Sequence, residues 1–250
     1  MNTGDTTFIL FCSTLVFFMT PGLAFFYGGL VRRKNVLNTM MSSLFIMGLS
    51  SALWILVGYS LSFSGDHGHI IGDFTNAFLR GIGMNDLSQY SETIPALVFV
   101  GFQMMFAIIT PALITGSVAG RMRFKALFIF ILLWLFVVYY PLAHMVWGKG
   151  GFLGEVLGSV DFAGGNVVHI SSGVSGLVLS LLLGSRRGYK KQAYATHNIP
   201  FIILGATILW FGWFGFNAGS ALAANGLAAH AFMTTGTSAA FALLSWMAVD

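Results

Sequence analysis

The chain has 250 residues, of which 56% are hydrophobic and only 8% charged, and its mean hydropathy is +0.83. Soluble globular domains carry about 25% charged residues, so this composition excludes a soluble domain. It also excludes a disordered chain, which would be poor in apolar residues. The formal net charge of +4 does not predict nucleic-acid binding, because most basic residues are confined to alternate loops. The composition is typical of a polytopic membrane protein.

Seven apolar segments are long enough to cross a bilayer, which takes about 20 residues in a helix. We expect them at about 7–31, 36–63, 94–120, 124–147, 162–184, 199–222 and 226–249. The first should not be a cleaved signal peptide, because the leading MNTGDTT has no basic residue. The segments lack the alternation of barrel strands. We therefore predict an all-α membrane protein with one transmembrane domain over residues 1–250.

The charged residues predict the orientation in the membrane. Ten of the twelve basic residues follow the first, third and fifth segments: Arg32, Arg33, Lys34, Arg121, Arg123, Lys125, Arg186, Arg187, Lys190 and Lys191. Seven of the eight acidic residues lie in the amino terminus or the other loops: Asp5, Asp66, Asp73, Asp86, Glu92, Glu155 and Asp161. Because basic loops stay on the cytoplasmic side, we expect the amino terminus outside and Asp250 inside.

The longest predicted loop, about 64–93, contains the run SGDHGHIIGD. Asp66, His67 and His69 supply oxygen and imidazole groups that could hold a metal ion. A solvated loop is the simpler interpretation, and we favour it.

Glycine is enriched, with 31 residues or about 12% of the chain, against a typical 7% or so. Gly116-x-x-x-Gly120 and Gly215-x-x-x-Gly219 have the spacing that allows membrane helices to approach closely.

Asp161 directly precedes the fifth segment, and His169 lies within it. At 1.5 Å per residue, His169 should lie about 12 Å beyond Asp161, near the middle of a hydrocarbon core about 30 Å thick. Desolvation there disfavours the imidazolium, and a neutral imidazole can guide a small polar solute or relay a proton. A hydrogen-bonded structural histidine is the alternative. Asp161 should cap the helix through the amides of Gly164 or Ala163, and its charge could also attract a cation.

Three side chains should lie near the outer ends of their helices: Trp147, Phe216 and Ser220. Aromatic residues at this level usually belong to the interfacial belt. Aromatic faces together with a hydroxyl would also form a cation–π site for a small cation. Phe106, in FQMMF, is most simply a core residue.

Five segments resemble, in order, those of the ammonium transporter family (Amt/Mep, related to Rh proteins). They are PGLAFFYGGLVRRKN at 21–35, FQMMF at 102–106, AHMVWG at 143–148, DFAGGNVVHISSGVSGLVLSLLLGSR at 161–186 and GWFGFNAGSA at 212–221. The resemblance covers essentially the whole chain, and Trp147 favours the Amt branch over Rh. It implies a homotrimer with one pore in each subunit, built in each case from about eleven helices as two inverted repeats.

The resemblance also implies roles for particular residues. Trp147, Phe106 and Ser220 would form an outer recruitment site supported by Asp161. Phe106 and Phe216 would be the stacked rings that close the pore, and His169 would be the first of two pore histidines. The partner histidine would belong to a helix beyond residue 250, because His197 lies in an inner loop and His230 near the outer end of the last segment. We therefore expect the chain to be a fragment of a longer protein.

The function implied is ammonium transport across the cell membrane. Ammonium would be recruited outside, would lose its proton, and would cross as ammonia. A dry constriction imposes a large desolvation penalty on any ion, and potassium cannot escape it by losing a proton. An ammonium sensor without net transport is the alternative, and uptake of methylammonium would separate the two. A cytosolic PII signal protein would be a partner through the loop 185–198, and no cofactor or metal is implied.

Two other classes fit less well. A rhodopsin-like receptor needs a lysine in its seventh helix, and 226–249 contains none. An intramembrane serine protease is suggested by Gly173-Val174-Ser175-Gly176, but only His197 and His230 follow as candidate bases. We therefore expect no enzymatic activity.

Overall fold

The computed structural model describes residues 1–186, 188–191 and 194–249, so Arg187 and Asp250 lie outside the described residues. Within that part, seven apolar helices are long enough to cross a membrane. They are Thr3–Leu30, Arg33–Phe63, Ala96–Val118, Phe124–Val156, Gly165–Leu183, Ile199–Gly219 and Gly226–Val249. The prediction of an all-α protein with seven membrane-length helices is confirmed. The described strands form one short hairpin, β1 (Leu87–Ser88) and β2 (Ser91–Pro95).

Three of the seven spans change their helical winding along their length. The second runs from α2 (Val36–Leu53) through a π-helical stretch, Trp54–Gly58, into α3 (Tyr59–Phe63). The fourth runs from α5 (Phe124–Trp134) through Leu135–Tyr139 into α6 (Tyr140–Trp147). The fifth opens with a π-helical stretch, Gly165–Ile170, before α7 (Ser171–Leu183). Such stretches often occur at functional sites, and the last one carries His169.

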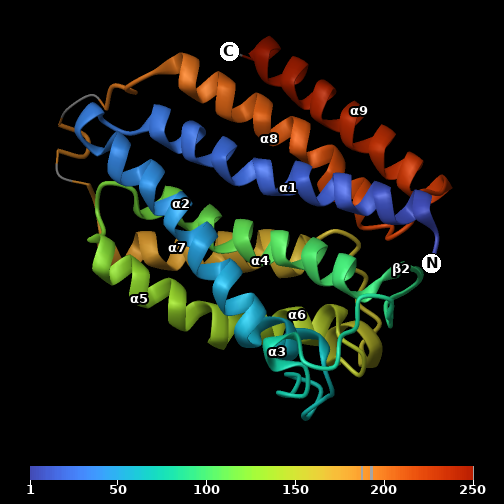
Figure 1. The fold of residues 1–250 in the computed structure, drawn as a ribbon. Coiled ribbons are helices and arrows are strands. Elements are labelled where there is room, and N and C mark those ends of the chain that lie inside the picture. The colour runs from blue at the N-terminus through green and yellow to red at the C-terminus, as the bar shows by residue number, and fades with distance from the viewer. Residues whose placement is uncertain (187, 192–193, 250) are drawn as a thin grey trace.

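The helix α4 (Ala96–Val118) forms the centre of the bundle, because it is the most buried of the seven spans and contacts α1, α2 and α7. The helix α1 (Thr3–Leu30) packs along α8 (Ile199–Gly219), and α9 (Gly226–Val249) lies on the far side of α8 (Figure 1). The span that forms α9 is the least buried of the seven. The core therefore lies around α4, and the last helix is peripheral.

The close approach predicted for Gly215 and Gly219 is confirmed in the packing of α8. A methyl group added at Gly215 would lie 3.0 Å from the carbonyl oxygen of Cys12 on α1, and one at Gly219 would lie 2.8 Å from the Cβ of Cys12. Gly116 similarly faces the ring of Tyr27. The prediction for Gly120 is wrong, because α4 ends at Val118 and Gly120 has φ +70°, which allows the chain to turn.

The two ends of the bundle differ in charge. At one, the basic end, the segments after α1, α4 and α7 meet: Arg121 Nη1 donates to the carbonyl of Gly184 at 2.7 Å, and Arg186 Nη1 to that of Ala119 at 2.8 Å. The Arg32 guanidinium lies over the ring of Tyr194, 4.4 Å from its centroid.

At the other, the acidic end, the amino terminus meets the hairpin, since the Asn2 amide donates to the Thr93 carbonyl at 2.7 Å. This is the segregation of charge that the loop pattern predicted.

Candidate functional site

A cavity of about 350 Å³ opens at the acidic end between α4, α6 and α8. Aromatic side chains form most of its wall, and its lining residues are Phe63, Tyr90, Phe99, Phe102, Gln103, Phe106, Trp147, Val160, Asp161, Phe162, Ser220 and Leu222. The fold thus brings together all four residues predicted for recruitment, although they are separated by up to 114 positions between Phe106 and Ser220. We call this space the aromatic cavity.

Trp147, the last residue of α6, is held in place by the loop that precedes α7. Its Nε1 donates to the backbone carbonyl of Asp161 at 2.9 Å. Its ring centroid lies 5.9 Å from that of Phe106, at an interplanar angle of 74°. Ser220, at the end of α8, donates its hydroxyl to the carbonyl of Phe216 at 2.9 Å. Its oxygen therefore keeps lone pairs that can accept a hydrogen bond from a cation.

Asp161 caps the fifth span through both carboxylate oxygens. Oδ1 accepts from the amides of Gly164 and Gly165 at 2.6 and 2.8 Å, and Oδ2 from those of Asn166 and Val167 at 2.7 and 3.1 Å. Capping through Gly164 is confirmed, whereas Ala163 is not among these four donors. Amides at a helix start are otherwise left without partners, and an anion is favoured there. Asp161 thus orders the start of this span and places a negative charge beside the aromatic cavity.

Phe106 and Phe216 separate the aromatic cavity from His169. Both rings are almost completely buried, and their centroids are 4.5 Å apart at an interplanar angle of 56°. The two rings are therefore in contact but tilted, which avoids the repulsion between two π faces, and their role in closing a pore stays a prediction. The ring of His169 stacks on Phe216, with the two centroids 5.7 Å apart and an interplanar angle of 30°. Cavity, phenyl pair and imidazole follow one another in space.

His169 lies nearer the start of its helix than predicted. The helix begins at Gly165 rather than 162, because residues 161–164 form the capped turn and Gly164 has φ +106°. His169 is therefore the fifth residue of the helical span, rather than the eighth of a helix that begins at 162. Its side chain is exposed in an open cavity of about 400 Å³ that Tyr27 also lines. Within the described residues neither ring nitrogen has a hydrogen-bond partner, so the interpretation as a hydrogen-bonded structural histidine is not supported.

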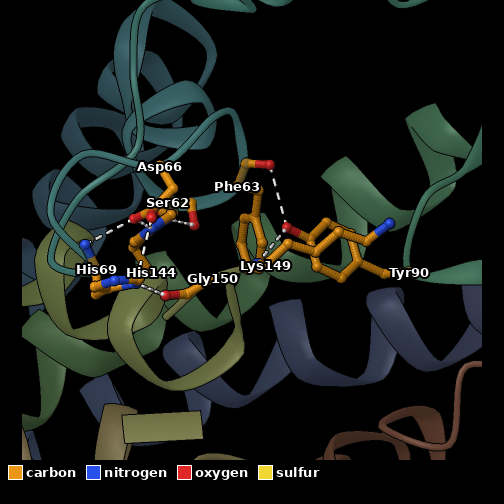
Figure 2. A network of polar contacts seen from close by, with 8 residues as sticks. All are labelled: Ser62, Phe63, Asp66, His69, Tyr90, His144, Lys149 and Gly150. Carbon is orange, nitrogen blue, oxygen red and sulfur yellow. Dashed lines mark hydrogen bonds and ion pairs between the residues drawn. The ribbon is translucent and has the colours of Figure 1, made fainter. Parts of the chain in front are cut away.

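A polar network beside the aromatic cavity was missed by the sequence analysis (Figure 2). His144 of α6 is fully buried, with Nε2 at 3.0 Å from Asp66 Oδ1 and Nδ1 at 3.2 Å from the Ser62 carbonyl. The hydrogen bond from His144 holds the pKa of Asp66 below its usual range. His69 Nδ1 lies 2.6 Å from the carbonyl of Gly150. The sequence AHMVWG contained His144, but no local signal indicated a partner 78 residues away.

The interpretation of loop 64–93 needs revision in part. Among the described residues no group of three or more His, Cys, Asp or Glu side chains could hold a metal ion. The metal interpretation of Asp66, His67 and His69 is therefore not supported. The favoured solvated loop is also incomplete, because Asp66 pairs with the buried His144 and fastens the loop to α6.

Ser175 has no arrangement suited to nucleophilic catalysis. Its hydroxyl donates to the carbonyl of Ser171 at 2.7 Å and accepts from Trp134 Nε1 at 2.8 Å. The amide of His197 donates to the carbonyl of Gly29 at the basic end, and His230 lies on the peripheral α9. Neither histidine hydrogen-bonds Ser175 in the described structure.

A larger cavity of about 840 Å³ lies at the basic end. Four cationic side chains line it, Arg32, Lys34, Arg121 and Arg186, and no carboxylate is among its described lining residues. Tyr27 lines both this basic cavity and the open cavity of His169. The two spaces therefore adjoin at this tyrosine.

The fold and the site define a multi-pass helical membrane protein with an aromatic cavity at one end and a histidine behind it. The family model described as the Ammonium Transporter Family matches residues 7–250, and the chain therefore belongs to this family. It is 51% identical over 250 residues to an ammonium transporter of Bacillus subtilis, covering all of this chain and 60% of that protein. It is 44% identical over 249 residues to ammonium transporter Amt1 of Archaeoglobus fulgidus, with 61% of that protein covered.

Solved structures agree with these relatives. The crystal structure of Candida albicans Mep2 superposes with a TM-score of 0.90 at 36% identity, covering all of this chain and 55% of that one. A structure described as a sensor Amt protein has a TM-score of 0.85 at 28% identity, covering 95% of this chain and 59% of that one. The chain thus spans about 60% of the length of the curated relatives it matches.

Proposed function

We propose that the protein carrying this chain transports ammonium across the cell membrane, with the aromatic cavity as its recruitment site. The observation that supports this most directly is the sequence of parts from the aromatic cavity through Phe106 and Phe216 to His169. Each part matches one step of the proposed route. The aromatic cavity binds a cation, the apolar rings of Phe106 and Phe216 block the passage of an ion, and the imidazole of His169 lies immediately beyond them.

Recruitment depends on interactions that suit a small cation carrying N–H groups. Trp147 and Phe106 offer π systems, which attract cations. The Ser220 oxygen accepts a hydrogen bond, which ammonium can donate and potassium cannot. Asp161 makes the local potential more negative while its oxygens remain bonded to backbone amides. The site therefore binds an ammonium ion without a carboxylate in direct contact with it.

Selection follows from what lies behind the cavity. Phe106 and Phe216 are 1% exposed, so an ion passing between them loses its hydration. That loss is very unfavourable for any charge in an apolar medium. Ammonium avoids it by transferring its proton to a water molecule in the aromatic cavity before the rings and crossing as ammonia towards His169. The hydrated proton returns to the outer solvent, or is passed on to the imidazole of His169 by a separate route.

The wider assembly is part of the same proposal. Seven helices would be joined by the rest of an eleven-helix, inverted-repeat fold, and the open face around His169 would receive its second histidine there. The acidic end faces outside and the basic end the cytosol. The protein forms a homotrimer, and a cytosolic PII protein contacts the basic loop 185–198.

A sensor is the second candidate, because a structure described as a sensor Amt protein superposes over 95% of this chain. A sensor would bind ammonium at the aromatic cavity without accumulating it. Uptake of methylammonium into lipid vesicles containing the intact protein separates the two. Transport predicts accumulation, and a sensor shows binding alone.

The experiment for the pore uses His169→Ala. We expect uptake of methylammonium to fall at least tenfold, or selectivity against potassium to be lost, because the imidazole behind the rings is removed. His230→Ala on α9 is the matched control and should leave uptake unchanged. Unaltered flux and selectivity in His169→Ala, with the protein correctly folded, would rule out the pore role.

A further inference from the structure

Two basic residues lie at the acidic end, Arg80 and Lys149, among loops that otherwise hold the acidic side chains. Lys149 follows Trp147 by two positions and is exposed. Within the described residues no carboxylate lies within ion-pair distance of its ammonium group, since the ion pairs there join only Asp66 to His69 and to His144. Lys149 therefore places an unneutralised positive charge beside a site proposed to bind cations.

The backbone of Lys149 is fixed to the wall of the aromatic cavity through Tyr90 (Figure 2). The Lys149 amide donates to Tyr90 Oη at 3.3 Å, and this hydroxyl donates to the carbonyl of Phe63 at 3.2 Å. Tyr90 and Phe63 both line the aromatic cavity. The backbone of Lys149 is therefore anchored to the cavity wall.

The side chain of Lys149 lies over the ring of the same tyrosine. Its Nζ is 5.8 Å from the Tyr90 centroid. The ring of Phe99 stacks on Tyr90 with centroids 4.7 Å apart and an interplanar angle of 12°, so it covers one face. The ring of Tyr90 therefore lies against both Phe99 and the Lys149 ammonium group. The ε-ammonium is itself an alkylammonium ion, chemically close to methylammonium, and it uses the interaction by which aromatic rings attract such ions.

We propose that Lys149 lowers the affinity of the aromatic cavity for ammonium. It acts as a tethered alkylammonium ion, because it occupies one ring of the cavity wall and repels a second cation. This inference rests on the proposed function of the cavity. Lys149 sets the ammonium concentration at which the aromatic cavity is half-saturated. The steps beyond Phe106 do not depend on it.

The test measures methylammonium uptake by the intact protein in lipid vesicles at low and high ionic strength. Lys149→Met keeps the length of the side chain and removes the charge. We expect its half-saturation concentration to fall by about two- to fourfold at low salt, from the Coulomb repulsion removed. The maximal rate should not change, because only binding is altered. At high salt the difference should disappear, since the Debye length shrinks to about 3 Å at 1 M.

Two further variants separate charge from structure. Lys149→Arg keeps the charge and should behave like the unmodified protein. Arg80→Met is the matched control, because the Arg80 guanidinium also lies over a ring, 5.6 Å from the centroid of Phe78, which does not line the aromatic cavity. It should leave half-saturation unchanged.

The inference is overturned if Lys149→Met shows the half-saturation of the unmodified protein, or if Arg80→Met shifts it equally. A shift that persists at high salt contradicts it as well, because it would not be electrostatic. These failures differ from failure of the proposed function, in which the unmodified protein itself shows no saturable uptake.

Discussion

The aromatic cavity and the basic cavity occupy opposite ends of one bundle and have opposite chemistry. The first, about 350 Å³, has aromatic walls and the carboxylate of Asp161. The second, about 840 Å³, is lined by four cationic side chains and no described carboxylate. Burial, and then repulsion from Arg121, hold the pKa of Arg186 below its usual value. The cavity proposed to attract cations thus lies opposite one lined by positive charge, which suits a solute that crosses without its charge.

The difference extends to how each end is stabilised. At the acidic end a carboxylate satisfies the amides that open a helix, and at the basic end guanidinium groups satisfy the carbonyls that close two helices. Both arrangements complement the helix dipole. Charge therefore serves the fold and the proposed route together, and variants can separate these two uses.

The largest effect is expected from Asp161→Ala, which removes the acceptor of four backbone amides. Loss of an N-cap alone lowers stability by about 0.5–2 kcal/mol. We expect a lower melting temperature and at least a tenfold loss of methylammonium uptake. Asp161→Asn, which keeps one acceptor oxygen, should recover stability more than uptake. Equal recovery of both would mean that the negative charge has no part in recruitment.

Trp147→Leu should have the next largest effect. It removes one aromatic face and the hydrogen bond from Nε1 to the Asp161 carbonyl. A cation–π contact contributes about 0.5–2 kcal/mol, so half-saturation for methylammonium should rise about two- to thirtyfold. Trp147→Phe keeps a ring, so its half-saturation concentration should lie between those of the unmodified protein and Trp147→Leu. If the Leu and Phe variants have the same half-saturation concentration, the π face is not what binds the cation.

A smaller effect is expected from pH acting on Asp66. Its pKa is lowered in the folded protein, so the pairing with His144 stabilises the fold above the unfolded pKa of about 3.9. This stability is lost as the pH falls through the lower folded value. The melting temperature should drop on acidification below about pH 4, and Asp66→Asn should reduce that slope. Asp86→Asn, in the same loop but bonded to the Gly83 amide, is the control. An identical slope in Asp66→Asn contradicts the pairing.

The smallest effect is expected from Lys34→Gln at the basic cavity. Its charge is far from the aromatic cavity, so half-saturation for uptake should change less than twofold, and stability by no more than about 0.5 kcal/mol. Lys125→Gln, which does not line the cavity, is the matched control. A shift as large as that expected for Lys149→Met would break the contrast between the two ends.

Much of the architecture was predictable because lipid requires each spanning segment to satisfy its own backbone, which makes long apolar helices visible in hydropathy. The resemblance also named Trp147, Phe106, Ser220 and Asp161, which do line one cavity, although their roles remain predictions. The start of the fifth span at Gly165 was not predictable, since it depends on the turn capped by Asp161.

Contacts between distant segments could not be predicted from the sequence for a different reason. His144 and Asp66 are far apart in the chain, and neither has a local pattern that indicates the other. The tilt between Phe106 and Phe216 likewise depends on how α4 and α8 pack. Sequence pattern reports what a helix buries, whereas these pairings depend on which helices become neighbours.

The most direct test of the account is competition during methylammonium uptake by the intact protein in lipid vesicles. We expect saturable uptake that ammonium inhibits and that an equal concentration of potassium leaves unchanged, because potassium neither donates to Ser220 nor loses a proton. Potassium inhibition as strong as that by ammonium, or uptake without saturation, would contradict the proposed recruitment at the aromatic cavity.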